Sequence, residues 1–224
     1  MAEPLELSID TASSIASIAL SREDALVAEE TWDCGRDHSR QLLPAIDALL
    51  ARRARTKEEF TAIFVCIGPG SYAGVRAGMS TAKGLAFALG IPIVGVGRLE
   101  IEAYAFAATG LPIVAVHRAG RGDVAWAAYQ GDPWREISSP QLSPLETLAD
   151  ALPAGALLVG ELEDAVAADL VQGGNRVVRG AASLRRAAVL AELGWQRLQD
   201  GRTDDPKSVE PLYLREPAIG PQNR

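Results

Sequence analysis

Three short apolar segments open the chain, and a charged turn separates the second from the third. Their length and their branched side chains are typical of β-strands, and the short turns between them favour antiparallel neighbours. The predicted three-stranded meander occupies residues 5–10, 15–20 and 25–31. Leucine and isoleucine then recur every three or four positions from residue 38 to 54, which is the spacing of one apolar helix face.

Two continuous apolar runs follow, at residues 61–67 and 91–97, and each has the length of a strand that is buried on both faces. Between them, a glycine-rich turn leads into a run of small residues, for which we predict a helix from 73 to 89. A further helix is expected from 98 to 108. The first half of the chain therefore has the predicted order βββαβαβα.

The second half repeats this order with shorter segments. Its predicted strands lie at residues 111–117, 123–130, 134–138, 155–160 and 175–180. Its predicted helices lie at residues 143–152, 162–172 and 183–201. The repeated βββα-led unit predicts an α/β protein of two related lobes, residues 1–109 and a smaller lobe over 110–224 that ends in a helix and a tail.

Composition and charge narrow the function classes. Apolar residues make up 48% of the 224 residues and aromatic residues only 5%, which suits closely packed α/β layers. The formal charge of −7 argues against a chain that binds nucleic acid or an anionic membrane by itself, and short basic clusters such as Arg185–Arg186 are expected on solvated helix faces. Two cysteines form neither a disulfide framework nor a metal-ligand spacing, and no secretory or membrane segment is expected, so we predict a cytoplasmic protein.

The glycine turn at residues 68–70 suggests a phosphate site, but both phosphate-binding motifs fail there. A P-loop places lysine directly after its last glycine, whereas Lys83 lies far into the predicted helix. The dinucleotide fingerprint has one residue too many before its third glycine. Small residues instead recur every four positions and form one smooth ridge at Gly74, Gly78, Ala82 and Ala86. This ridge packs either inside the chain, on its own sheet or on the helix at 38–54, or against a helix of another protein.

Asp10, Thr11 and Ser13 lie in the turn after the first strand. Actin-like ATPases hold a metal and phosphates at such a turn, so these three residues are weak candidates for a nucleotide site. The alternative is a turn in which the same side chains hydrogen-bond nearby backbone groups. Ala12 stands where a glycine would admit a phosphate, and His117 replaces a carboxylate at the corresponding strand end of the second half. With two histidines and no G-x-S-x-G sequence, the chain also lacks the common hydrolase motifs.

Four segments together resemble the TsaB family, formerly called YeaZ. The most specific is the turn and helix GPGSYAGVRAGMSTAKGLAFALGIPIVGV at residues 68–96. The others are LSIDTASSIASIAL (7–20), DHSRQLLPAIDALL (37–50) and EPLYLREP (210–217). The match is not complete, since Tyr72–Ala73 replaces Phe-Thr of the family, and His117–Gly122 replaces a shorter Asp-Ala-Arg-Arg-Gly segment.

The resemblance implies an actin-like ATPase (ribonuclease H-like) fold of two βββαβα-type lobes, the second one reduced, with no catalytic residues and no metal of its own. It implies an adaptor that binds and activates TsaD, the subunit that transfers a threonylcarbamoyl group to the adenosine next to the anticodon of tRNA. TsaE joins the larger assembly, the isolated chain forms a homodimer, and tRNA is contacted only indirectly. No cofactor is expected on the chain alone, and a nucleotide at the interface with TsaD is left open.

In this family the first two helices pair with helices of TsaD, and by position these are residues 38–54 and 73–89 here. The predicted interface residues are His38, Leu42, Leu43, Ile46, Gly74, Gly78, Ala82 and Ala86. The alternative function is an enzyme of the actin-like superfamily, either a nucleotide-binding ATPase that uses Asp10 and Thr11 or a peptidase-like hydrolase.

Overall fold

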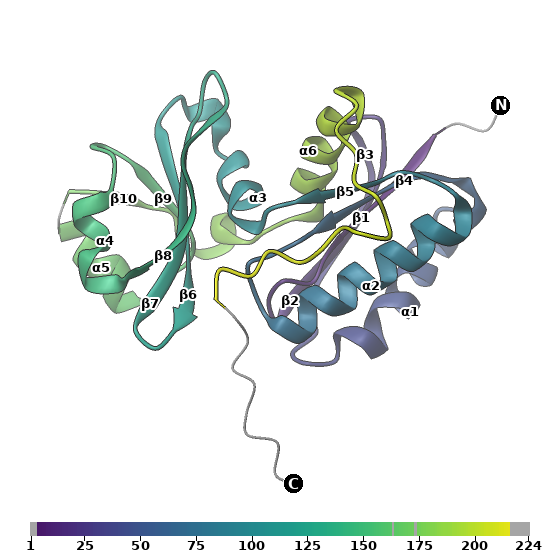
Figure 1. Ribbon diagram of the computed structural model, residues 1–224, viewed down its shortest axis with the longest axis horizontal. Coiled ribbons are helices and arrows are strands. Elements are labelled where there is room, and N and C mark those ends of the chain that lie inside the picture. The colour runs from purple at the N-terminus through teal and green to yellow at the C-terminus, as the bar shows by residue number, and fades with distance from the viewer. Residues whose placement is uncertain (1–3, 163, 173, 216–224) are drawn as a thin grey trace, which may run out of the picture.

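The computed structural model describes residues 4–162, 164–172 and 174–215. Within these residues the helices and strands form two lobes side by side, each built around one five-stranded sheet (Figure 1). Among the described residues, no helix is both long enough and apolar enough to cross a membrane.

The first sheet has the strand order β3-β2-β1-β4-β5. Its strands are β1 (Leu5–Asp10), β2 (Ile15–Arg22), β3 (Ala25–Asp33), β4 (Phe60–Cys66) and β5 (Ile93–Val96). β1 pairs antiparallel with β2 and β2 with β3, as predicted for the meander, while β4 and β5 continue the sheet in parallel. These two parallel strands are the continuous apolar runs, and they are buried because helices cover both faces of the sheet.

The second sheet has the order β8-β7-β6-β9-β10, which is the same order once each strand is matched by its position in its half of the chain. Its strands are β6 (Pro112–Gly120), β7 (Asp123–Gln130), β8 (Arg135–Pro144), β9 (Leu157–Glu161) and β10 (Arg176–Val177). The match confirms the predicted fold class of two repeated α/β lobes. The expectation of shorter strands throughout the second half is wrong, because β6 (9 residues) and β8 (10 residues) are longer than β1 (6 residues) and β3 (9 residues). The second lobe is reduced at β9 and β10, whose 5 and 2 residues compare with 7 and 4 in β4 and β5.

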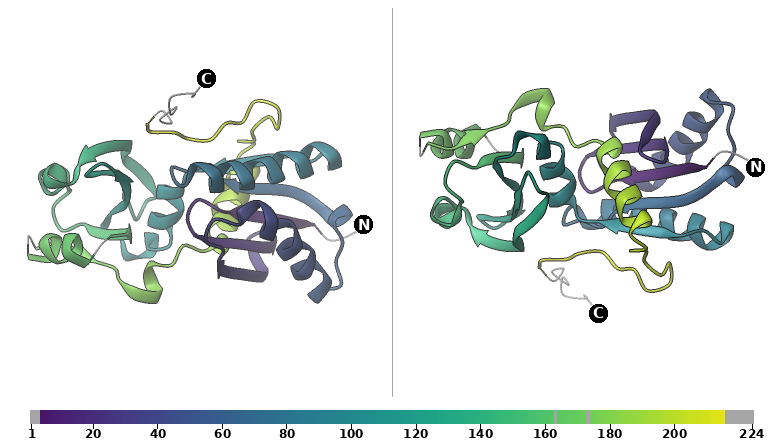
Figure 2. Two further views of the ribbon diagram at one scale, coloured as in Figure 1. Left: turned by 90° about the horizontal axis from the view of Figure 1, so that it is seen from below. Right: turned by 90° about the horizontal axis from the view of Figure 1, so that it is seen from above.

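Each lobe receives a helix from the other half of the chain. The helices are α1 (His38–Arg52), α2 (Tyr72–Leu89), α3 (Arg98–Tyr104), α4 (Leu145–Ala151), α5 (Asp164–Gln172) and α6 (Ala187–Gln199). α1 and α2 cover one face of the first sheet, whereas α6 covers the other, with Leu190 and Leu193 in the core cluster of Phe64. α3 packs on the second sheet, where Leu99 and Ile113 share a cluster, and α4 and α5 cover its opposite face (Figures 1 and 2). Neither lobe completes its core from its own half of the chain.

Three predicted helices begin two or more residues later than expected. The helix predicted from residue 162 begins at Asp164, and the other two differ for local reasons. The last helix begins at Ala187 and not at residue 183, because the chain forms a short 3-10 turn there and stays extended as far as Arg186. The helix predicted from residue 143 begins at Leu145, because β8 keeps its pairing with β7 up to the residue before it.

The C-terminal strap, residues 202–215, runs back over the first lobe from the end of α6 (Figure 1). At its start it bonds to β5 through backbone and carboxylate groups. On α2, Lys83 donates to the Val209 carbonyl oxygen of the strap at 3.0 Å. The strap ends with Arg215, which forms an ion pair with Asp123 of β7. The strap therefore links α2 and β5 to the second lobe.

Gly194 of α6 tests how closely this helix must approach the first sheet. A Cβ at this position would overlap the ring of Phe64. We expect Gly194→Ala to lower the free energy of unfolding by about 1–3 kcal/mol, because the overlap outweighs the gain in helix propensity. In the matched control, Gly84→Ala in α2, the new Cβ enters open space and should raise the free energy of unfolding by about 0.5–1 kcal/mol. Urea titrations measure both values, and changes of the same sign would contradict the prediction.

Candidate functional site

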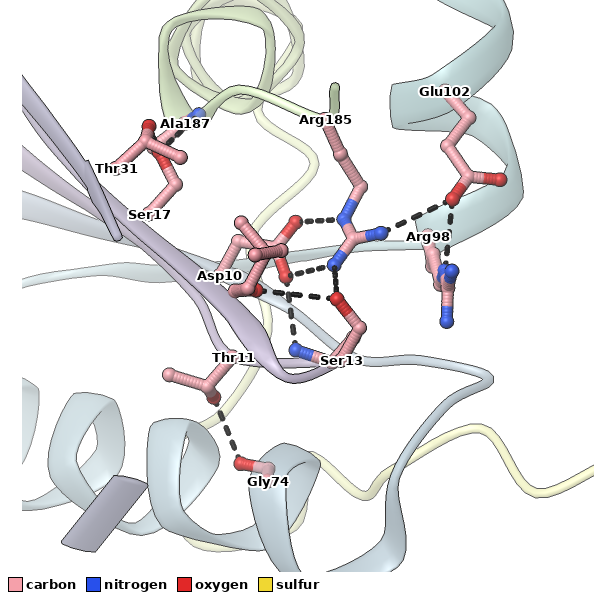
Figure 3. Close-up of polar contacts among 12 residues, drawn as sticks. Asp10, Thr11, Ser13, Ser17, Thr31, Gly74, Arg98, Glu102, Arg185 and Ala187 are labelled. Carbon is pink, nitrogen blue, oxygen red and sulfur yellow. Dashed lines mark hydrogen bonds and ion pairs between the residues drawn. The ribbon is translucent and has the colours of Figure 1, made fainter. Parts of the chain in front are cut away.

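A buried network of charges joins the two lobes (Figure 3). Asp10 ends β1, Glu102 lies on α3, and Arg185 precedes α6. The Arg185 guanidinium binds both carboxylate oxygens of Asp10, with Nη2 3.1 Å from Oδ1. It also donates to Glu102 Oε1 at 3.1 Å and to Ser13 Oγ at 3.2 Å. Arg98 donates from Nε to the same Glu102 oxygen at 2.9 Å. The network thus sets two carboxylates against two guanidinium groups.

The charges of this network compensate one another inside the protein. All four groups are buried, which corrects the expectation that Arg185 lies on a solvated helix face. A buried charge is destabilising by several kcal/mol unless a partner compensates it, so each group depends on the others. Because Asp10 belongs to the first sheet and α3 packs on the second, the network also fixes how the lobes meet.

Burial and charge act on Asp10 in opposite directions. Removal from water would raise the pKa of its carboxyl group, but the charge and the hydrogen bonds of Arg185 together outweigh burial and lower that pKa below its ordinary value. Burial likewise disfavours the charged form of Arg185, whereas the carboxylates of Asp10 and Glu102 raise the pKa of its guanidinium. Both groups therefore stay charged at neutral pH.

The weak nucleotide candidates Asp10, Thr11 and Ser13 lie together after β1, and their polar atoms are engaged inside the chain. Asp10 Oδ1 accepts the Ala12 amide at 3.0 Å, and Thr11 Oγ1 donates to the Gly74 carbonyl oxygen at 2.8 Å. The alternative of a turn whose side chains hydrogen-bond the backbone therefore describes this segment.

The donor set at Asp10 does not fit a bound metal ion. Both Asp10 oxygens already bind Arg185, so a guanidinium stands where a cation would have to lie. In the part of the chain that the structure describes, no three His, Cys, Asp or Glu side chains are grouped to hold a metal. In this structure the Asp10 carboxylate therefore serves as the partner of Arg185.

The small-residue ridge of α2 packs inside the chain. A Cβ at Gly74 would overlap the carbonyl oxygen of Thr11, and a Cβ at Gly78 would overlap the Thr11 hydroxyl group. Ala82 and Ala86 lie in the core cluster that contains the buried face of α1. The ridge therefore packs inside the chain and not against another protein. The segment that approaches α2 closely is the turn after β1.

Most of the predicted interface residues face the interior. The buried ones are His38, Leu42, Ile46, Gly74, Gly78, Ala82 and Ala86. His38 donates from Nε2 to the Ser13 carbonyl oxygen at 2.7 Å and so ties α1 to the first hairpin. Leu43 differs from the others because it is 44% exposed. A partner of α1 and α2 must therefore use their other faces, and the pairing of these helices with a partner stays a prediction.

A second stripe of small residues on α2 points outward, and the sequence prediction did not include it. We define the outward α2 face as Ala73, Ala77, Ser80, Gly84 and Phe87, all exposed or half-buried. Phe87 is 68% exposed, and a Cβ at Gly84 would meet nothing within 4 Å. The signal in the sequence is Gly84 itself, a helical glycine that does not belong to the buried four-residue series.

Several known proteins resemble this chain in sequence. The TsaB protein of Escherichia coli, a tRNA threonylcarbamoyladenosine biosynthesis protein by name, is 31% identical over 218 residues, which cover 93% of this chain and 94% of the relative. The chain belongs to the TsaB family. The TsaB protein of Bacillus subtilis is 43% identical over 94 residues, which are 42% of this chain and 41% of that protein. A family model described as TsaD, tRNA N6-adenosine threonylcarbamoyltransferase, matches residues 32–150, which include α1, α2 and α3.

Solved structures agree with membership of the TsaB family. A protein from Pseudomonas aeruginosa, described as similar to peptidase YeaZ, superposes with a TM-score of 0.80 at 29% identity over 95% of this chain and 100% of that one. A ROK hexokinase from Thermus thermophilus superposes with a TM-score of 0.53 at 13% identity, which shows a shared fold alone. This TsaB-family chain therefore has the actin-like ATPase (ribonuclease H-like) fold that the resemblance implied.

Arg185 is the member of the charge network with the most partners, so its removal should be the most destabilising. Arg185→Met keeps much of the side-chain volume but leaves Asp10 buried without its counter-charge, and we expect the free energy of unfolding to fall by about 3–5 kcal/mol. Arg186→Met is the matched control, because Arg186 is exposed and its pairing with Glu29 contributes about 1 kcal/mol or less. Urea unfolding measures both losses, and an equally small loss in each would show that the network is dispensable.

The lowered pKa of Asp10 predicts a loss of stability in acid. The unfolded carboxyl group has a pKa of ~3.9, so the contribution of Asp10 is complete above that value and is lost as the pH falls through the lower pKa of the folded state. We expect the stability difference between the wild type and Asp10→Asn to be largest near neutral pH and to shrink below about pH 4. Urea titrations at several pH values measure this difference, and one that does not change with pH would refute the assignment.

Proposed function

We propose that this TsaB-family chain is a non-catalytic adaptor that binds TsaD and activates it in the transfer of a threonylcarbamoyl group to the adenosine next to the anticodon of tRNA. The observation that carries the proposal is the outward α2 face, which combines a glycine inside a helix with an exposed phenylalanine. The names of the relatives support the pathway, and the TsaD family model covers α1 and α2.

Among the residues that the structure describes, none packs closely enough on Gly84 to require a glycine there. A glycine inside a helix is destabilising by about 1 kcal/mol relative to alanine. Close packing explains Gly74 and Gly78, whereas the space beside Gly84 is open. A bound partner helix would explain the glycine at this position. Small residues let two helix axes approach each other to the lower end of the usual range of ~8–10 Å.

The occupant that we propose for the outward α2 face is a helix of TsaD. The stripe carries small uncharged residues with Phe87 near its end, so it suits an apolar helix and not a charged segment. α1 lies beside α2 (Figure 1), and its Leu43 is exposed. Without TsaD, a second copy of the chain takes the same place as a homodimer. TsaE joins the TsaD-bound assembly, and the assembly works in the cytoplasm.

The same geometry supports an adaptor over an enzyme. Asp10 and Thr11, which an ATPase would use, are engaged by Arg185 and by the α2 backbone. A peptidase would use a histidine as its base, but His38 bonds a backbone carbonyl oxygen at 2.7 Å and His117 another at 2.8 Å. Calorimetry with Mg-ATP tests the ATPase alternative, and micromolar binding to the isolated chain would favour it. A nucleotide held between this chain and TsaD stays part of the proposal.

A larger side chain on the outward α2 face tests the docking surface. Gly84→Leu fills space outside the core, so the chain should fold normally while its Kd for TsaD rises by about 30-fold or more. Ala149→Leu, at an exposed position of α4 in the second lobe, is the matched control and should leave the Kd unchanged. Calorimetric titration measures each Kd, and the rate of tRNA threonylcarbamoylation should follow the same order.

Two results would contradict this proposal in different ways. If the wild-type chain does not associate with TsaD, or if TsaD modifies tRNA equally well without it, the adaptor function is wrong. If the Gly84→Leu chain binds TsaD as tightly as the wild type does, TsaD uses another surface.

A further inference from the structure

A cavity of about 360 Å³, which we call the interlobe cleft, lies between the lobes where α2 begins. Residues of both lobes and of the C-terminal strap line it. The basic residues of its lining are Arg98, His117, Arg118 and Arg215, and no carboxylate lines it among the described residues. The chain as a whole carries a charge of −7, so this lining differs in sign from the rest of the protein. A cleft of this kind favours an anionic ligand.

Three arginines line the interlobe cleft. Arg98 is only 2% exposed and donates from Nε to Glu102, and the half-buried Arg215 pairs with Asp123. Arg118 is exposed. Neither of these two carboxylates lines the cleft, so arginines supply the charged side chains among its described lining residues. Guanidinium groups match the geometry of phosphate oxygens.

An aromatic pair lies at the rim of the interlobe cleft. Tyr72, the first residue of α2, stacks on Tyr213 of the strap, with ring centroids 5.3 Å apart and planes inclined by 29°. The two tyrosines are 45% and 39% exposed. The Arg76 guanidinium lies 5.1 Å from the centroid of the Tyr72 ring. Exposed aromatic rings beside arginines are the surface on which unpaired nucleic-acid bases stack.

We propose that the interlobe cleft and the tyrosine pair bind a single-stranded segment of RNA. One backbone phosphate enters the cleft beside Arg118 and Arg215, and a neighbouring base stacks on Tyr72 or Tyr213. The ligand is extended, because it reaches both the arginines of the cleft and the exposed tyrosine rings beside them. That this RNA is tRNA rests on the proposed function. The site gives this chain a direct contact with tRNA in place of the indirect one that the family resemblance implied.

The test measures the Kd of a fluorescent tRNA transcript for the full chain, alone and in complex with TsaD. Arg118→Gln should raise the Kd and lower the slope of log Kd against log salt by about 0.7 between about 50 mM and 200 mM salt, because one phosphate contact is lost. Tyr213→Leu should raise the Kd by about 5-fold to 150-fold and leave the salt slope unchanged, because a stacked base is lost. Arg135→Gln, at the start of β8 and outside the cleft lining, is the control of equal charge and should change neither quantity.

Each other outcome has a definite meaning. If both cleft variants bind the transcript as the wild type does, alone and in complex, the RNA site is disproved. If the transcript does not bind but AMP does, and Arg118→Gln raises the Kd of AMP, the cleft binds a mononucleotide and the RNA proposal is overturned. The Gly84→Leu variant distinguishes the RNA proposal from the adaptor function. Its affinity for TsaD should fall, whereas the variant alone should bind the transcript as the wild type does.

Discussion

The ion pair between Arg185 and Asp10 is the contact on which the arrangement of the lobes depends. Arg185 lies in the link that enters α6, so the pair that neutralises the end of β1 also places that helix on the first sheet. α6 completes the apolar cluster around Phe64. The segment that carries Arg185 into α6 is therefore required both to neutralise Asp10 and to bury this cluster. The turn after β1, which holds the weak nucleotide candidates, is thus anchored to the start of α6 through Arg185.

α2 shows how one helix can serve the interior and the surface with the same kind of residue. Its inner glycines accept the turn after β1 so closely that no side chain would fit, and this contact fixes the position of the helix. At its outer glycine, Gly84, an added Cβ would meet no atom of the described residues within 4 Å. The close inner contact holds the outer face in a defined position. A partner helix can therefore bind this face at a small cost in conformational entropy.

The sequence predicts the two lobes and most of their elements, because apolar periodicity reports which faces are buried. The sequence also predicts the close packing of α2. The spacing of Gly74 and Gly78, however, indicates only that another segment of backbone approaches this helix closely. Which backbone it is depends on the fold, and here it is the chain's own. The sequence alone predicts Arg185 on the surface, because an arginine pair carries no periodic signal and its partners Asp10 and Glu102 are distant in sequence. Local sequence patterns do not predict ion pairs between residues that are distant in sequence.

The exchange of helices between the lobes has a consequence for the order in which the protein is made. The strands of the first sheet leave the ribosome early, but the face that carries Phe64 stays uncovered until α6 follows near the end of the chain. During that interval the nascent chain exposes a sheet face rich in apolar residues, which is the condition under which chaperones bind and aggregation begins. A chain cut between the lobes would leave this face open permanently, so the first half is not a unit that can be produced alone.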